Sequence, residues 1–254
     1  MEMKSAMFRF YEELNDFLPI NRRKVRFTVQ FKDSPGIKDL IESLGIPHTE
    51  VDLILVNGRS VDYGYHVENG DDIAVYPAFE SFDITPLLHL HPAPLRHSAF
   101  ILDVHLGRLA RYLRTLGFDT LYRNDYTDVQ IVQIAQSEHR IVLTRDSGIL
   151  KYNAVTHGYW VRSVTAREQL REIVRRFDLC RSFKPFSRCP VCNGIVENID
   201  KSKIIDMLEP KTKQFYEEFS RCGNCGKLYW KGSHYEKLTK MIHDICASDR
   251  KEDS

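Results

Sequence analysis

The sequence contains no run of about 18 or more apolar residues, so it lacks a segment that could cross a membrane as a helix. The stretch from Met1 to Phe10 also lacks the apolar core and the small-residue cleavage site of a secretory signal peptide. We therefore expect a cytoplasmic protein with no membrane partner. The composition, with 43% hydrophobic and 28% charged residues, is that of a globular chain, and 254 residues suffice for roughly two or three domains.

An excess of charge of one sign is missing as well, because the net charge is only +1. This value hides a separation of charge along the chain: residues 1–80 carry −5, whereas residues 97–180 and 181–254 carry +3 each. A polyanion such as RNA would bind the C-terminal two-thirds, since neutralising phosphates releases counterions. An ordinary solvated surface explains +3 per segment about as well.

Residues 1–80 are predicted to form one small domain in which strands surround a helix. The expected elements are a strand at 25–29, a helix at 36–44 and strands at 53–56 and 73–76. The dipeptide Asn57-Gly58 favours a type I′ hairpin turn. This order resembles the β-grasp fold of ubiquitin-like sulfur carriers. Those carriers need a flexible Gly-Gly tail, which is missing here, so we expect no carrier chemistry and expect the domain to be dispensable for any catalysis elsewhere.

Residues 81–97 are predicted to be a linker, because they hold three prolines and follow no clear period. Three histidines lie in or beside this segment, namely His89, His91 and His97. Exposed imidazoles on a stiff linker explain them better than a metal site does.

From residue 98 to 180 the sequence alternates between apolar strands and amphipathic helices. The expected strands are 99–102, 120–122, 141–144 and 158–161, and the expected helices are 106–116, one with its N-cap at Asp128, and one from a capping box at Thr165 to Phe177. Gly117 is expected to end the first of these helices. Such an alternation predicts an α/β fold, a parallel sheet with helices on both faces.

Three carboxylates occupy functionally suggestive positions in this predicted sheet. Asp103 and Asp146 each follow a strand, and Asp128 begins a helix. Ligand sites of parallel sheets form beyond the carboxyl ends of the strands, so these side chains can converge. Their mutual repulsion would be relieved by Mg²⁺ or Mn²⁺, which prefers oxygen ligands and can activate water for phosphodiester hydrolysis. The alternative is that they only end strands and cap a helix.

Two stretches of this region resemble the Mut-seven C-terminal ribonuclease family, which is PIN-like. They are residues 101–119, ILDVHLGRLARYLRTLGFD, and residues 141–146, IVLTRD. The resemblance spans about residues 98–245, and the N-terminal segment is similar to the ubiquitin-like partner often fused to this family. It implies that Asp103, Asp128 and Asp146 hold a catalytic metal, with Asp125 as a weaker fourth residue.

Arginines near these carboxylates are candidates for RNA contacts. Arg108 and Arg111 share a helix face, and Arg145 directly precedes Asp146. Guanidinium groups grip phosphates bidentately, and Arg114 is a further candidate with less weight. The alternative is that these arginines pair with the carboxylates or simply face solvent.

Four cysteines are arranged as two Cys-x-x-Cys pairs separated by 29 residues, and they are Cys189, Cys192, Cys222 and Cys225. Two such turns complete a tetrahedron of thiolates, so we expect a structural Zn²⁺ rather than disulfides. Gly194 and Gly226 are expected to adopt positive φ, and residues 201–218 to form a helical arm. Cys180 and Cys246 are expected to be semi-buried thiols.

The stretch after the last cysteine resembles the Trp-x-Gly-Ser-His sequence of the same family. Its cations, Lys231 and His234, are candidates for RNA contacts, whereas Trp230 is expected to pack the small zinc domain.

Together these features predict a metal-dependent ribonuclease whose zinc ribbon helps to bind RNA, with tRNA and other structured RNAs among the candidates. The predicted segments are a β-grasp domain (1–80), a linker (81–97), a PIN-like nuclease domain (98–180), a zinc-ribbon domain (181–246) and a tail (247–254). Two alternatives remain open: a non-catalytic adaptor bound to RNA, tRNA or the ribosome, and a scaffold that binds a protein partner through the β-grasp domain.

Overall fold

The structure, a computed structural model, describes residues 3–77 and 98–252, with side chains described up to residue 245. The predicted linker and its three histidines lie outside the described residues. The chain divides into two compact units, one made of residues 1–97 and 128–160 and the other of residues 98–127 and 161–254. Within the described part, no helix combines the length and the apolar character needed to cross a bilayer.

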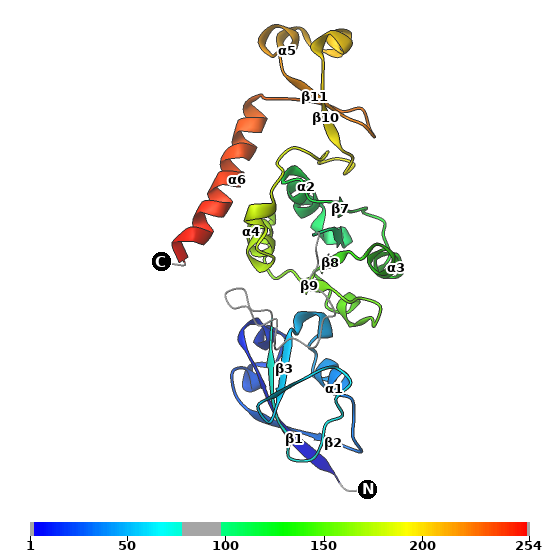
Figure 1. Cartoon of the computed structure of the whole chain (residues 1–254), viewed down its shortest axis with the longest axis vertical. Coiled ribbons are helices and arrows are strands. Elements are labelled where there is room, and N and C mark those ends of the chain that lie inside the picture. Colours follow the sequence, from blue (N-terminus) through cyan, green and yellow to red (C-terminus); the bar gives the residue numbers. More distant parts are fainter. Residues whose placement is uncertain (1–2, 78–97, 253–254) are drawn as a thin grey trace. The chain divides into compact units, whose positions relative to one another are not determined.

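The N-terminal region forms a five-stranded sheet with the order β2-β1-β5-β3-β4 and a helix packed on it (Figure 1). Its elements are β1 (Lys4–Phe10), β2 (Phe27–Phe31), α1 (Ile37–Ser43), β3 (Leu53–Val56), β4 (Arg59–Val61) and β5 (Asp72–Tyr76), with short 3-10 helices η1 (Glu12–Phe17), η2 (Ile20–Arg22) and η3 (His48–Glu50). The helix packs through Ile37, Leu40 and Ile41, which share one face because they are three to four residues apart. We call residues 3–77 the β-grasp domain.

β1 was not predicted from the sequence, although this strand pairs with β2 in antiparallel and with β5 in parallel orientation. Ala6, Phe8 and Phe10 alternate into the core. Met7 on the opposite face is apolar too and is 38% exposed, so it blurs the period of two that marks a half-buried strand.

The predicted hairpin turn between β3 and β4 is confirmed. Asn57 and Gly58 both have positive φ, 51° and 80°, as a type I′ turn requires. The turn fixes the register in which Val56 pairs with Arg59.

The predicted α/β fold is also confirmed, as a four-stranded sheet with the order β7-β6-β8-β9 that is flanked by helices. The strands are β6 (Phe100–Leu102), β7 (Thr120–Leu121), β8 (Ile141–Thr144) and β9 (Gly158–Trp160), and the helices are α2 (Gly107–Thr115), α3 (Asp128–Glu138) and α4 (Ala166–Arg176), with 3-10 helices η5 (Val104–Leu106), η6 (Ile149–Lys151) and η7 (Leu179–Ser182). β6 pairs with β7, and β8 with β9, in parallel orientation. β6 and β8 are buried along their whole length and are apolar except for Thr144, as expected for central strands of a sheet covered on its faces.

The capping box at the start of α4 is confirmed, since the Thr165 hydroxyl accepts a hydrogen bond from the Glu168 amide and donates one to the Glu168 carboxylate. The predicted N-cap at Asp128 is wrong by one position: α3 begins at Asp128 itself. Its carboxylate therefore lies in the first turn, where it still interacts favourably with the helix dipole.

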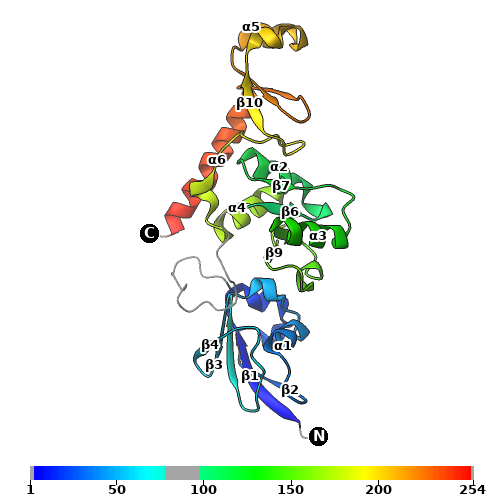
Figure 2. The same cartoon turned by 45° about the vertical axis from the view of Figure 1, so that its right-hand side comes forward.

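A second, three-stranded sheet follows, with the order β10-β11-β12. Its elements are β10 (Val196–Ile199), β11 (Phe219–Cys222) and β12 (Leu228–Trp230), and we call them the ribbon. Between β10 and β11 lies the predicted arm, made of η8 (Lys201–Lys203), η9 (Ile205–Met207) and α5 (Pro210–Phe215). After the ribbon comes a single long helix, α6 (Ser233–Glu252), which includes residues 247–252 of the predicted tail (Figure 2).

The prediction that Cys180 is a free thiol is wrong, because Cys180 is disulfide-bonded. The argument against disulfides came from the missing secretion signal, which says nothing about which thiols lie next to each other. The side chain of Cys246 lies outside the described side chains.

Gly117 ends α2 for two separate reasons. Its φ is +96°, a conformation that side-chain-bearing residues rarely adopt, and a Cβ at this position would lie 2.2 Å from the carbonyl oxygen of Lys184. The backbone of the segment after α4 thus approaches the end of α2 more closely than any other residue type would permit.

We predict that Gly117→Ala lowers the free energy of unfolding by about 3 kcal/mol, because backbone strain and a clash with main-chain atoms add up. Gly70→Ala is the matched control, since Gly70 has a similar φ of +88° but nothing within 4 Å of the added Cβ. That variant should cost about 1 kcal/mol. Urea unfolding of the full chain, followed for the domain that carries each change, measures both values. Equal losses would contradict the close approach at Gly117.

Candidate metal centre and catalytic residues

The four predicted cysteine ligands converge on one point. Their Sγ atoms all lie within 4.8 Å of one another, with Cys189 and Cys225 3.7 Å apart and Cys192 and Cys222 3.4 Å apart. A tetrahedral ion with metal–sulfur bonds of about 2.3 Å needs sulfur atoms about 3.8 Å apart. The four thiols therefore fit a single tetrahedral metal ion.

Both Cys-x-x-Cys segments form knuckle turns, which present their sulfur atoms on the same side. In the first, the Asn193 amide donates to the Cys189 carbonyl at 2.9 Å, and in the second the Gly226 amide donates to the Cys222 carbonyl at 3.0 Å. Gly226 has the predicted positive φ, 71°, but in the first knuckle Asn193 takes this role with a φ of 69°. Gly194 is needed for space instead, since a Cβ there would lie 2.9 Å from the Cys222 sulfur.

The thiols differ in how readily they ionise. Burial disfavours the Cys189 thiolate, but hydrogen bonds from the Tyr229 hydroxyl, at 3.0 Å, and from the backbone amides of Cys192 and Val191 outweigh it and lower the pKa of Cys189 to about 6. Burial and, to a smaller extent, the hydrogen bond with Cys222 raise the pKa of Cys192 to about 12. Metal binding must therefore displace a proton from Cys192, whereas Cys189 is already ionised near neutral pH.

The first knuckle is fastened to the end of α2 by a buried arginine. Arg114 is only 4% exposed; its Nε donates to the carbonyl of Thr120 at 2.9 Å and its Nη1 to the carbonyl of Val191 at 2.9 Å. Burial lowers the pKa of Arg114, and the electrostatic attraction between its guanidinium group and the sulfur atoms of Cys189 and Cys192 opposes that shift. The idea that Arg114 binds phosphate is therefore wrong, because its donors already hold main-chain carbonyls.

A second contact between the knuckle and the α/β fold runs through Asn193. Its amide nitrogen donates to Asp119 Oδ1 at 2.8 Å, and its amide oxygen accepts from the Thr120 amide at 3.0 Å. Arg188 completes this network, with bonds to Asp119 Oδ2 at 3.1 Å and to the Asn193 carbonyl at 2.9 Å. These residues were not predicted from the sequence, since their partners lie 69 to 74 positions away in the chain.

Asp103 and Asp125, two of the predicted acidic residues, differ strongly in exposure. Asp103 directly follows β6, is 3% exposed and accepts a hydrogen bond from the His105 amide at 2.8 Å. Asp125 is exposed and forms a bidentate pair with Arg123, at 2.9 and 2.7 Å, which lowers the pKa of Asp125. The buried Asp103 is thus held in place by the backbone, while Asp125 has an arginine partner that a metal ion would have to replace.

Asp128 and Asp146 are both exposed. Asp146 lies two residues after β8: its amide donates to the Thr144 hydroxyl and its Oδ1 accepts from the Gly148 amide, both at 2.8 Å. These bonds fix the orientation of the Asp146 carboxylate. Asp103 and Asp125 belong to one compact unit and Asp128 and Asp146 to the other, so the convergence of the four carboxylates remains a prediction.

Apart from Arg114, the predicted RNA-binding cations lie on the surface. Arg108 and Arg111 are exposed on α2, Arg145 is exposed beside Asp146, and His234 is exposed in the first turn of α6. Lys231 is exposed as well but pairs with Glu218 at 2.5 Å.

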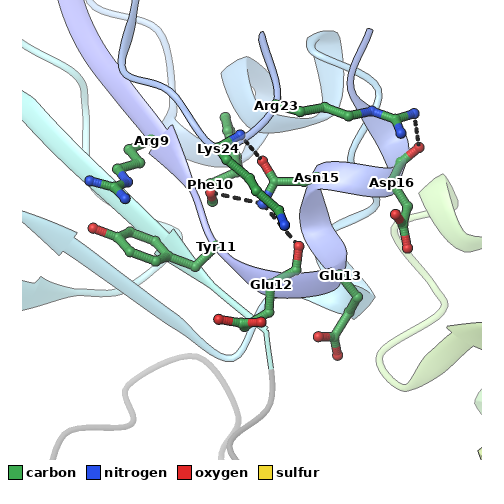
Figure 3. Close-up of a pocket in the computed structure, with 9 residues that line it drawn as sticks. All are labelled: Arg9, Phe10, Tyr11, Glu12, Glu13, Asn15, Asp16, Arg23 and Lys24. Carbon is green, nitrogen blue, oxygen red and sulfur yellow. Dashed lines mark hydrogen bonds between the residues drawn. The ribbon is translucent and has the colours of Figure 1, made fainter. Parts of the chain in front are cut away.

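A groove of the β-grasp domain, shown in Figure 3, lies at the end of β1 and contains none of the predicted site residues. Its central polar side chain is Asn15, whose Nδ2 donates to the carbonyls of Phe10 and Glu12 and whose Oδ1 accepts from the Lys24 amide. These bonds use the donors and the acceptor of the Asn15 amide. Asn15 therefore links η1 to its neighbours and is not a ligand site.

Comparison with protein families agrees with the predicted architecture. The model of the Mut7-C RNAse domain matches residues 98–242, which is more than half of the chain, and the model of the Mut7-C ubiquitin domain matches residues 3–83. Neither the curated proteins nor the solved structures gave a match. The fusion of a ubiquitin-like domain to a nuclease-like domain with four clustered cysteines is thereby confirmed.

We predict that Arg114→Met weakens metal binding by the four cysteines by about tenfold, on the scale of changes to residues that support metal ligands. The variant leaves the carbonyls of Thr120 and Val191 without their buried donor, so the knuckle loosens. Competition titration of Zn²⁺ against a coloured chelator measures the effect. Arg171→Met, which removes an exposed arginine of α4, is the control, and an equal affinity in both variants would contradict the anchoring role.

Proposed function

Because the chain belongs to the Mut7-C RNAse domain family, we propose that it is a metal-dependent ribonuclease that hydrolyses RNA phosphodiester bonds. The family match indicates a nuclease-like role. One observation supports the catalytic part of the proposal: Asp103 and Asp146 follow β6 and β8, which are neighbours in the sheet order. The carboxyl ends of parallel strands share an edge, where this class of fold holds its ligands.

Asp103, Asp128 and Asp146 would hold Mg²⁺ or Mn²⁺, with Asp125 as a further acidic residue. Carboxylate oxygens are the ligands that these ions prefer, and the backbone amides of His105 and Gly148 orient the carboxylates of Asp103 and Asp146. When bound, such an ion lowers the pKa of water and stabilises the charge that develops on the phosphate. The chain itself fixes the direction of the two carboxylates before RNA arrives.

Exposed arginines supply the contacts to the phosphates. Arg108 and Arg111 are three residues apart on α2, so they form one cationic face, and Arg145 is adjacent to Asp146. Their planar guanidinium groups suit bidentate contacts to phosphate. On the ribbon side, Lys231 and His234 extend the RNA surface, and Lys231 exchanges Glu218 for a phosphate when RNA binds.

The four cysteines hold zinc, and its role is structural. Four thiolates leave no coordination position for water or substrate, and the ion connects the two knuckles from which the ribbon extends. The ribbon assists RNA binding only as long as the ion keeps its strands together. The β-grasp domain, by its ubiquitin-like fold, provides a surface for a protein partner.

We expect about one zinc ion per purified chain by elemental analysis. Between about pH 6 and pH 8 the apparent affinity should rise at least about tenfold per pH unit, because the Cys192 thiol, with a pKa of about 12, must lose its proton on binding. Calorimetry in buffers of different ionisation enthalpy counts the protons released. Protein isolated without zinc and with these four thiols joined in disulfides would contradict the assignment.

The catalytic proposal predicts that Asp146→Asn and Asp103→Asn each reduce RNA cleavage by at least about a hundredfold, equivalent to about 3 kcal/mol of transition-state stabilisation. Each change keeps the shape of the side chain and removes one negative charge from the metal site. The fold should survive, and RNA binding should persist because the arginines are intact. Cleavage is measured on one RNA with Mn²⁺ and with EDTA.

Asp62→Asn is the matched control, since Asp62 is exposed and accepts a hydrogen bond from the amide two residues on, as Asp146 does, but lies in the β-grasp domain. This variant should cleave RNA like the wild type. Equal cleavage by all four proteins would point to a contaminant or a different site. A non-catalytic adaptor that binds RNA would then be the better interpretation of the protein's function.

A further inference from the structure

The β-grasp domain contains a short turn that is buried although its residues are polar. In η3, His48 and Thr49 are each 5% exposed and Glu50 is 1% exposed. This turn packs against β9 and η6, which belong to the α/β fold and lie in the same compact unit. Burying polar side chains is costly unless they are hydrogen-bonded, so the partners of η3 show what the contact does.

Two residues of η3 are bonded directly to backbone groups of the nuclease fold. Glu50 Oε1 accepts from the Trp160 amide at 2.5 Å, and His48 Nε2 lies 2.9 Å from the Val155 carbonyl. On its other side His48 Nδ1 lies 2.6 Å from Glu42 Oε1, which holds the ring in place. The turn is therefore fastened to both ends of the segment that leads into and forms β9.

The hydrogen bond between Glu50 and Trp160 lies at the edge of the sheet. β9 is the outermost strand in the order β7-β6-β8-β9, so among the described residues no strand lies on its other side. An edge of this kind is a liability that proteins cover with other elements. At this edge Glu50 accepts a hydrogen bond from the amide of Trp160, the last residue of β9. The end of β9 is therefore bonded to the β-grasp domain.

The side chain of Trp160 contacts both the β-grasp domain and the turn that contains the predicted metal ligand Asp146. One face of its indole packs against Phe17 of the β-grasp domain, with ring centroids 4.9 Å apart. Its Nε1 donates to the carbonyl of Arg145 at 3.1 Å. That carbonyl belongs to the residue just before Asp146, in the turn that the amide of Gly148 closes onto the Asp146 carboxylate.

We propose that the β-grasp domain positions the catalytic turn of the nuclease, with Trp160 as the positioning residue between Glu50 and Phe17 on one side and the Arg145–Asp146 turn on the other. The inference rests on the proposed function in so far as Asp146 is a metal ligand. It reverses the expectation from sequence that the N-terminal domain is dispensable for catalysis. Glu50 holds the backbone amide of Trp160, and Phe17 packs against the indole ring. The indole N–H in turn holds the carbonyl of Arg145 in the turn.

Trp160→Phe in the full chain tests the last step, because phenylalanine keeps the ring against Phe17 and removes the indole N–H. We expect kcat for RNA cleavage to fall about tenfold and the Mn²⁺ concentration for half-maximal activity to rise about tenfold, since a displaced Asp146 binds metal less well. KM for RNA should change less than about twofold, because the exposed arginines are untouched. A merely structural role would not separate metal dependence from RNA binding in this way.

Glu50 tests the first step with a conservative pair of variants. Glu50→Ala loses the acceptor for the Trp160 amide and should reproduce the effects of Trp160→Phe. Glu50→Gln retains a side-chain carbonyl at the same place and should restore most of the activity. Lys38→Met is the matched control, since the exposed bond from Lys38 to Asn153, at 2.8 Å, joins the same two regions without reaching Trp160. It should behave like the wild type.

Hydrogen exchange of the Asp146 and Gly148 amides gives a readout that does not need cleavage. Their exchange should become about tenfold faster in Trp160→Phe and Glu50→Ala and stay unchanged in Lys38→Met. If the wild type does not cleave RNA at all, the proposed function fails and these exchange rates alone decide the inference. Unchanged exchange in Trp160→Phe, or faster exchange combined with a wild-type Mn²⁺ dependence of cleavage, overturns it.

Discussion

The attachment of the two smaller domains depends on charged side chains that are buried and hydrogen-bonded to backbone groups of a neighbouring domain. Arg114 of α2 holds the carbonyl of Val191 in the first knuckle, and Glu50 of η3 holds the amide of Trp160 at the end of β9. Leaving such a group buried without its partner costs about 1–3 kcal/mol or more when it is charged. Each contact therefore joins a smaller domain to the α/β fold through a buried hydrogen bond that is costly to break.

The electrostatics of the metal centre follow from the same contacts. Four thiolates around a divalent ion would carry an excess of negative charge, and the guanidinium of Arg114 is a cation close enough to interact with Cys189 and Cys192. The Tyr229 hydroxyl and the knuckle amides stabilise the Cys189 thiolate in addition. A bound ion and the arginine would support each other: the metal would shape the knuckle whose carbonyl groups Arg114 binds, and Arg114 would offset the charge of the ligands.

Local patterns in the sequence were enough to predict most elements and the metal ligands. The turn at Asn57-Gly58, the capping box at Thr165 and the paired cysteines each depend on neighbours within a few residues. What could not be predicted depends on distant partners. Arg114 looked like a surface cation until Val191, 77 positions away, was seen to accept its hydrogen bond, and the spacing of Cys180 gave no sign of its disulfide.

The predicted acidic site contains both kinds of feature, those that local patterns predict and those that depend on distant partners. Strand ends could be read from apolar runs, so the positions of Asp103 and Asp146 followed from sequence, and the structure adds the amides that orient them. The contacts that support the turn at Asp146 could not be predicted from the sequence, because Trp160 and Glu50 are 110 residues apart and neither belongs to a motif.

β9 has only three residues and lies at the edge of the described sheet, so contacts from outside the sheet can hold its last residue, Trp160, whose indole binds the carbonyl of Arg145. A ubiquitin-like fold can serve in this way through η3 and η1, which supply Glu50 and Phe17.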